Sequence, residues 1–110
     1  MTSSPNRKAI GMIILVVLLH APARADDAAA KLYQSKCALC HAADGGGNTA
    51  VGKALKIMDL RDSEVRKLAD AELTTIITRG KDNKMPAFEK SLKADEIKRL
   101  VAYVRELAKK

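Results

Sequence analysis

The stretch Cys37-Ala38-Leu39-Cys40-His41 decides how this chain of 110 residues is interpreted. The pattern Cys-x-x-Cys-His is the attachment signature of a c-type haem. Two thiols three residues apart lie on one helical turn, where each can form a thioether with a haem vinyl group. The histidine that follows can supply an axial nitrogen to the iron. The sequence therefore predicts one covalent haem c, attached through Cys37 and Cys40, with His41 as an iron ligand.

Other uses of two cysteines fit the chain less well. A closed zinc site usually takes four Cys or His ligands. The chain has two cysteines and two histidines, and His20 lies in a segment that we expect to be removed. A dithiol redox site normally belongs to a βαβ pattern, and the sequence shows no strand run. A disulfide between Cys37 and Cys40 would close too small a loop to stabilise much.

The first 25 residues are typical of an export signal. Arg7 and Lys8 form a charged start, 10–19 is a short apolar run, and Ala23-Arg24-Ala25 offers a cleavage site. The apolar run is shorter than the roughly 20 residues that a membrane span needs. We therefore expect residues 1–25 to be cleaved, and an uncleaved membrane anchor is the alternative.

Residues 26–110 are long enough for one domain. Without Arg7, Lys8 and Arg24, this part has 17 basic and 13 acidic residues, a net charge of +4. So mild a charge is not typical of a nucleic-acid-binding surface, and no aromatic side chains are interleaved with the basic ones to stack on bases. The composition excludes nucleic acid as the expected partner.

Hydrophobic periodicity predicts an all-α domain. The clearest pattern is in the last helix, where apolar residues recur at i, i+3, i+4 and i+7 from about residue 93 or 94 to the terminus. A helix is predicted from Asp26 to about Cys40, and Asp62 is a plausible N-cap for a short one over 62–68. Another runs from Asp70 until Gly80 ends it. Residues 51–60 are apolar without a clean period.

A haem iron with one histidine keeps a sixth position, and a thioether there raises the reduction potential and blocks small ligands. Residues 26–110 contain Met58 and Met85. Met58 lies among apolar residues, so filling a gap in the core is its ordinary explanation. Met85 lies in a polar loop and precedes Pro86, which biases its backbone towards an extended conformation. Met85 is therefore the predicted sixth ligand.

These features together resemble the class I monohaem cytochromes c. The shared features are the Cys-x-x-Cys-His motif, a Met-Pro-Ala-Phe segment 44 residues after His41 and a closing helix with Leu-Val-Ala-Tyr-Val. The short distance between ligands is similar to that of the small bacterial and photosynthetic members. The resemblance covers residues 26–110 and implies a cytochrome c fold of three to five helices around one covalent haem. It also implies that the haem is attached on the periplasmic side. The resemblance further implies that Tyr33 and Tyr103 lie where the first and last helices cross.

The sequence departs from the family pattern at three places. Ala29 stands where the family usually has a glycine at the helix crossing. No proline lies between His41 and Pro86, although a proline carbonyl typically accepts the hydrogen of the free ring nitrogen of the axial histidine. We therefore expect another carbonyl, within residues 43–53, to take that role. Lys93 replaces the usual Ser or Thr N-cap, so no capping box is expected there.

The function that this reading predicts is a soluble, periplasmic one-electron carrier that is not an enzyme. It would shuttle electrons between larger redox proteins. Docking to an acidic partner would be aided by four lysines beside the haem-contacting segments: Lys36, Lys53, Lys81 and Lys84. Two alternatives stay open. One is a haem subunit held permanently by an oxidoreductase. The other is a ligand-binding haem enzyme or sensor with a labile sixth position.

Overall fold

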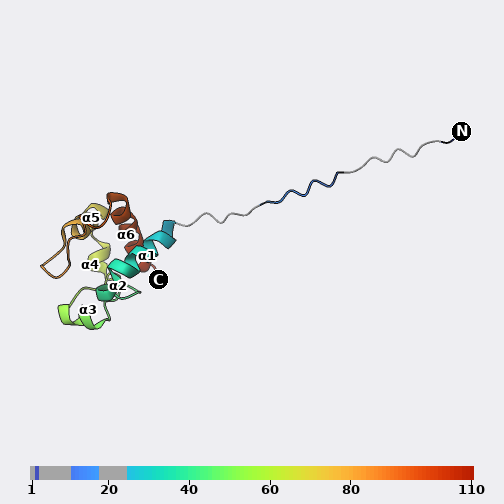
Figure 1. Cartoon of the computed structure of the whole chain (residues 1–110). Helices are drawn as coiled ribbons and strands as arrows, with labels where there is room; N and C mark the ends of the chain where they lie inside the picture. The colour runs from blue at the N-terminus through green and yellow to red at the C-terminus, as the bar shows by residue number, and fades with distance from the viewer. Residues whose placement is uncertain (1, 3–10, 18–24) are drawn as a thin grey trace.

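A computed structural model describes residue 2, residues 11–17 and residues 25–110 of the chain. Residues 25–110 contain six helices and no β-strand (Figure 1), which confirms the all-α prediction. In chain order the helices are α1 (Ala25–Lys36), α2 (Ala38–His41), α3 (Ala50–Leu55), α4 (Ser63–Arg66), α5 (Asp70–Arg79) and α6 (Ala94–Leu107). Two of them, α2 and α4, are single turns of four residues.

The predicted export segment is described in part. Residues 11–17 have no regular secondary structure and their side chains are exposed. The charged start at Arg7 and Lys8 and the cleavage site after Ala25 fall largely on residues that lie outside the described ranges. Across the residues that the structure describes, no helix combines the length and apolar character needed to cross a bilayer.

Helices α1 and α6 pack together and form the frame of the domain (Figure 1). At their contact the Tyr33 and Tyr103 rings lie 5.0 Å apart at an interplanar angle of 44°. Tyr33 and Leu100 are the largest fully buried side chains. The expected pairing of these two tyrosines is confirmed. Ala29, which replaces the expected glycine, is also buried on α1.

Helix α5 packs on the same α6 and completes the core. A second apolar cluster joins Val65 of α4, Leu73 of α5 and Val101 of α6. The apolar periodicity of α6 explains why one helix serves both clusters, because Leu100 and Val101 point to neighbouring sides of its apolar face. The packing of α1 and α5 on α6 leaves room between them for the site described below.

Side chains at the helix ends explain where the short helices begin. The Thr49 hydroxyl accepts the Gly52 N–H at 2.8 Å and starts α3. The Asp62 carboxylate accepts the Glu64 N–H at 3.3 Å, which confirms Asp62 as the N-cap of α4. Gly80, with φ of 79°, ends α5 as predicted.

Three expectations about the helices differ from the structure. The helix predicted over 26–40 is interrupted at Cys37, whose φ of −121° ends α1 and starts α2 as a separate turn. At Lys93 the Glu96 carboxylate accepts the Lys93 N–H at 2.9 Å, so half of a capping box forms although the lysine side chain offers no acceptor. Six helices rather than three to five result, because α2 separates from α1 and residues 50–55 form α3.

Candidate functional site: an apolar cavity with an imidazole and a thioether

The Cys-x-x-Cys-His segment forms one tight turn. The Cys37 carbonyl accepts the N–H groups of Cys40 at 3.2 Å and of His41 at 2.9 Å. Both cysteines are partly buried free thiols. Burial, followed by the charge of neighbouring Cys40, raises the pKa of the Cys37 thiol to about 11. The turn therefore places both thiols and the imidazole on one short element, as the spacing predicts.

Three successive backbone carbonyl groups at the end of this turn accept hydrogen bonds. The Cys40 carbonyl accepts the Thr49 hydroxyl at 3.0 Å, and the His41 carbonyl accepts the Gly47 N–H at 2.8 Å. The Ala42 carbonyl accepts the Tyr33 hydroxyl at 2.6 Å. The end of a helix leaves its last carbonyls without intrahelical partners, so these bonds satisfy the end of α2.

The glycine-rich loop that follows has small residues because the chain passes close to itself. A Cβ at Gly52 would lie 2.4 Å from the Cys40 carbonyl oxygen, and one at Gly47 would lie 3.2 Å from Ile57. The loop is joined to the segment after α3 by Arg61, whose guanidinium pairs with Asp59 at 2.9 Å and with Asp44 at 3.4 Å. These contacts hold the loop against the His41 turn.

The His41 side chain is partly buried, and that burial lowers its pKa. Its Nδ1 atom is buried and has no hydrogen-bond partner within the described part of the chain. The expectation that a carbonyl of residues 43–53 accepts from His41 is therefore wrong. The loop contacts this turn through its donors, the Gly47 N–H and the Thr49 hydroxyl, which bond the backbone carbonyls of His41 and Cys40.

Met85 is held at the end of a short hairpin whose loop is residues 82–84. Lys81 and Met85 form an antiparallel bridge, with their N–H and C=O groups joined at 3.0 Å in both directions. The two residues at the tip, Asp82 and Asn83, have φ of 55° and 56°. The Lys84 N–H donates to the Lys81 carbonyl at 3.0 Å across this left-handed pair, so residues 81–84 have the positive-φ pattern of a type I′ turn.

Two further contacts fix this hairpin in the fold. A Cβ at Gly80 would lie 2.5 Å from the Met85 carbonyl oxygen, so this close approach requires glycine in addition to its role in ending α5. The Lys84 ammonium donates to the Leu55 carbonyl at the end of α3, at 3.2 Å. Sequence reasoning missed both roles, because neither residue signals its spatial neighbour.

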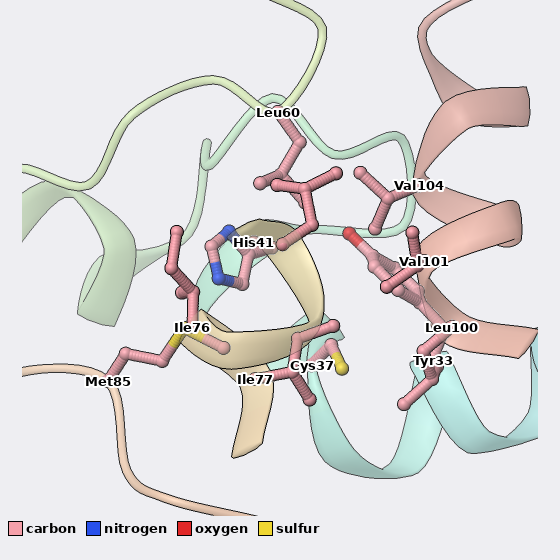
Figure 2. A pocket seen from close by; sticks show the side chains of 11 residues that line it. Tyr33, Cys37, His41, Leu60, Ile76, Ile77, Met85, Leu100, Val101 and Val104 are labelled. Atoms are coloured by element: carbon pink, nitrogen blue, oxygen red, sulfur yellow. The ribbon is translucent and has the colours of Figure 1, made fainter. Parts of the chain in front are cut away.

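The predicted site residues meet at one cavity. Cys37, His41 and Met85 line it, and Figure 2 shows the Met85 side chain extending towards the His41 ring. The remaining lining is almost wholly apolar and comes from α5, α6 and the loop before α4; it includes Leu60, Ile76, Ile77, Leu100, Val101 and Val104. Cys40 lies on the adjoining turn and does not itself line the cavity.

The lining of this cavity is chemically suited to a haem. An imidazole and a thioether are an axial pair that c-type cytochromes use, and a thiol for covalent attachment lies in the same wall. A planar, largely apolar macrocycle needs apolar walls, and α5 and α6 supply them. Within residues 25–110, no protein group forms a hydrogen bond with the buried Nδ1 of His41.

Met58, the other methionine of residues 26–110, lies outside the cavity. Met58 is 50% exposed and does not line the cavity, so its interpretation as a core gap-filler is wrong. The four lysines suggested for docking, Lys36, Lys53, Lys81 and Lys84, are all exposed. Of these, Lys84 has its ammonium bonded to the Leu55 carbonyl.

Comparison with known proteins assigns the class. Residues 24–104 match the family described as cytochrome c oxidase, cbb3-type, subunit III. The sequence is 36% identical to cytochrome c6 of Gloeothece citriformis, over 94% of this chain and 97% of that protein. It is 38% identical to cytochrome c6 of Rippkaea orientalis, over 84% and 81% of the two chains.

A solved structure gives the same result for the fold. The KustC0563 c-type cytochrome matches with a TM-score of 0.66 and 32% identity, over 72% of this chain and 95% of that one. The protein therefore belongs to the c-type cytochromes. Within them it is a class I monohaem member that carries covalent haem c with its iron and has the all-α cytochrome c fold.

Proposed function

We propose that this protein is a soluble one-electron carrier whose haem iron is ligated by His41 and Met85 and whose haem is attached through Cys37 and Cys40. One observation carries the proposal. An imidazole and a thioether from segments 44 residues apart enter one apolar cavity, and the hairpin that bears Met85 is fixed at both ends. The full-length similarity to two cytochromes c6 supports the same function.

The chemistry of attachment accounts for both cysteines. Each thiol would add across one vinyl group of the haem, forming a carbon–sulfur bond while the thiol hydrogen moves to carbon, with no net loss of electrons. Cys37 stands in the cavity wall and Cys40 is one turn further along the same element. Two such bonds on one turn would hold the macrocycle edge against α2.

When bound, haem supplies a reversible one-electron change at its iron. The chain's residues make that change suitable for a carrier. Met85 would occupy the sixth position and exclude small ligands, while the apolar walls exclude water and favour the less charged reduced state. His41 is the only histidine of residues 26–110, so no distal histidine is present to support an enzymatic reaction.

The visible absorption spectrum tests the proposal. Protein matured in a periplasm competent for haem c attachment is measured oxidised, reduced and with carbon monoxide. We expect a low-spin spectrum with the weak long-wavelength methionine–iron band, unchanged by carbon monoxide. Met85→Ala should lose this band and bind carbon monoxide, whereas Met58→Ala, the matched control, should keep it. Ready carbon monoxide binding by the unaltered protein would instead favour a ligand-binding enzyme or sensor.

We propose further that the protein is exported to the periplasm and that residues 1–25 are cleaved. The charged start, the short apolar run and the Ala23-Arg24-Ala25 site support this. N-terminal sequencing of the protein recovered from a periplasmic fraction should begin at Asp26. Recovery of the intact chain in the membrane fraction would support an anchor in place of a signal.

The exposed lysines Lys36, Lys53, Lys81 and Lys84 are proposed to steer docking to acidic redox proteins. The rate of electron exchange with an acidic partner should then fall steeply as ionic strength rises. Changing Lys36, Lys53 and Lys81 to glutamine should flatten that salt dependence. Changing three other exposed lysines, Lys93, Lys98 and Lys109, to glutamine provides a control of equal charge.

A second candidate function is a haem subunit of an oxidoreductase complex. The cbb3-type cytochrome c oxidase subunit CcoP of Azospirillum brasilense is 34% identical over 93% of this chain, which spans 36% of that protein. The similarity shows that a module of this kind occurs inside a larger chain. Stoichiometric co-purification with an oxidase or dehydrogenase would favour the subunit, and isolation as a free monomer would favour the carrier.

A further inference from the structure

Ala42, the residue directly after His41, has an unusual backbone conformation. Its φ is 63° and its ψ is 164°. Positive φ combined with so extended a ψ is a region that essentially glycine alone adopts at low cost. A residue with a Cβ remains there only when its surroundings hold it. In this chain the strained position adjoins the proposed axial ligand.

The Tyr33 hydroxyl is one group that holds Ala42 in this conformation. It donates to the Ala42 carbonyl at 2.6 Å, while the Gly45 N–H reaches the same oxygen at 3.2 Å. Tyr33 is 2% exposed, and its ring packs against Tyr103 of α6. The hydroxyl therefore acts from a fixed point in the core, the contact between α1 and α6.

The imidazole of His41 has no hydrogen bond of its own to fix its orientation. Its Nδ1 atom is buried without a partner in the part of the chain that the structure describes. Such a bond is the usual means of orienting a ligating histidine. Here the ring can be oriented through its own backbone, which is held by Gly47 on the His41 carbonyl and by Tyr33 on the Ala42 carbonyl.

We propose that Tyr33 is a positioning residue for His41. Its hydroxyl holds the Ala42 peptide in a conformation that alanine would otherwise leave, and this peptide sets the direction in which the His41 ring points. The inference rests on the proposed function, because it takes His41 as an axial ligand of the haem iron.

The test compares two conservative changes in the holoprotein. Tyr33→Phe removes the hydroxyl and keeps the ring, and Tyr103→Phe does the same to its packing partner, whose hydroxyl makes no hydrogen bond in the described residues. The proton NMR shifts of the haem methyl groups in the oxidised protein depend on the orientation of the axial ligands. We expect Tyr33→Phe to change the order or spread of these shifts and Tyr103→Phe to leave them unchanged.

A double-mutant cycle separates positioning from general stability. Glycine adopts the conformation of residue 42 without strain, so Ala42→Gly should make the Tyr33 hydroxyl less necessary. In the Ala42→Gly background, Tyr33→Phe should produce at most a small change in the methyl shifts. If Tyr33→Phe alone does not fold with haem, the Ala42→Gly/Tyr33→Phe variant should restore the native pattern, and failure to restore it would overturn the proposal.

The outcomes for the two proposals differ. A high-spin spectrum of the unaltered protein would remove the proposed His41/Met85 ligation itself. A normal low-spin spectrum, with equal methyl shifts in Tyr33→Phe and the unaltered protein, would remove only the positioning role of Tyr33. An equal change in both backgrounds of residue 42 would also overturn it, because the effect would then not act through the strained peptide.

Discussion

The guanidinium of Arg105 on α6 pairs with the carboxylate of Asp70, the first residue of α5, at 2.9 Å. The same guanidinium donates to the carbonyls of Val65 and Arg66 at 3.5 and 3.3 Å and to that of Leu68. One side chain from the last helix therefore satisfies the carbonyls at the end of α4 and in the turn before α5. This arrangement joins α4, α5 and α6.

Replacing Arg105 should destabilise the fold more than replacing its acidic partner. Arg105→Met would remove the guanidinium donor from the Arg66 and Leu68 carbonyls, while the Val65 carbonyl would keep the Leu68 N–H at 3.1 Å. The expected cost is about 1–3 kcal/mol. Asp70→Asn removes only the ion pair with Arg105, in which the Asp70 carboxylate is exposed. Such a pair is worth about 0–1 kcal/mol. Denaturant unfolding of the two holoprotein variants measures the difference. Equal losses would mean that the ion pair, not the carbonyl contacts, carries the interaction.

Gly80→Ala should weaken the hold on Met85. The added Cβ would lie 2.5 Å from the Met85 carbonyl oxygen, and φ of 79° is unfavourable for alanine. Strain of this kind costs about 1–3 kcal/mol. We expect the methionine–iron band to weaken and carbon monoxide to bind. Gly46→Ala is the control, since its Cβ would meet the flexible end of the Arg61 side chain. A full band in Gly80→Ala would contradict the prediction.

Asn83→Gly should strengthen the same hairpin. A type I′ turn favours glycine at its second central position, and Asn83 occupies it with φ of 56°. Relief of this strain is worth at most about 1 kcal/mol. The temperature at which the methionine–iron band disappears should rise. Asn48→Gly is the control, because Asn48 lies in a loop and does not have positive φ. This change should not raise the temperature at which the band disappears. A rise in both variants would show that the effect is not specific to the hairpin.

Lys93→Ser should stabilise α6. The backbone of Lys93 already has N-cap dihedrals, and Glu96 supplies one half of a capping box. A serine hydroxyl would supply the other half and add about 0.5–1 kcal/mol. Thermal unfolding followed by circular dichroism measures the gain. Ala69→Ser offers a parallel case, because Glu72 accepts the Ala69 N–H at 3.1 Å in the same way. An unchanged or lower melting temperature for Lys93→Ser would count against the argument.

The Asp59–Arg61 contact should make stability depend on pH in the acid range. Hydrogen bonds from Arg61 hold the pKa of Asp59 below its ordinary value of 3.8. A carboxyl whose pKa is lower in the folded state stabilises that state above the unfolded pKa, and the contribution is lost as pH falls through the folded value. Asp59→Asn should therefore be less stable than the unaltered protein above pH 4, and the difference should shrink below it. A constant difference across this range would be evidence against linkage.

Much of the helical framework could be predicted from the sequence. The periodicity of Ile97, Leu100, Val101, Val104 and Leu107 gave the buried face of α6, and Asp62 and Gly80 marked helix ends correctly. These are local signals that depend on neighbouring residues along one helix. The break at Cys37 was not predictable in this way, because the segment contains no glycine or proline that would mark the end of a helix.

The site was predicted less completely. Cys37, His41 and Met85 do line one cavity, although their roles as attachment point and ligands stay a prediction. Met58 was placed in the core from its apolar neighbours, yet it is half exposed. Its segment has no clean period, so the sequence offered no sign of which side would face solvent. That the buried Nδ1 of His41 has no partner among the described residues likewise depends on the path of the loop in space, which no local pattern indicates.

By itself the sequence determined the chemistry that this chain can carry out. A Cys-x-x-Cys-His spacing puts two thiols and an imidazole on one turn whatever surrounds it, and a methionine before proline in a polar loop is conspicuous without any fold. Only the tertiary structure decided how firmly these groups are held. Tyr33 reaches Ala42, Gly80 abuts Met85 and Arg105 joins α4 to α5 because packing α1 and α5 on α6 brings distant segments together. Such contacts cannot be predicted from neighbouring residues in the sequence, because the path of the chain in space determines which residues meet.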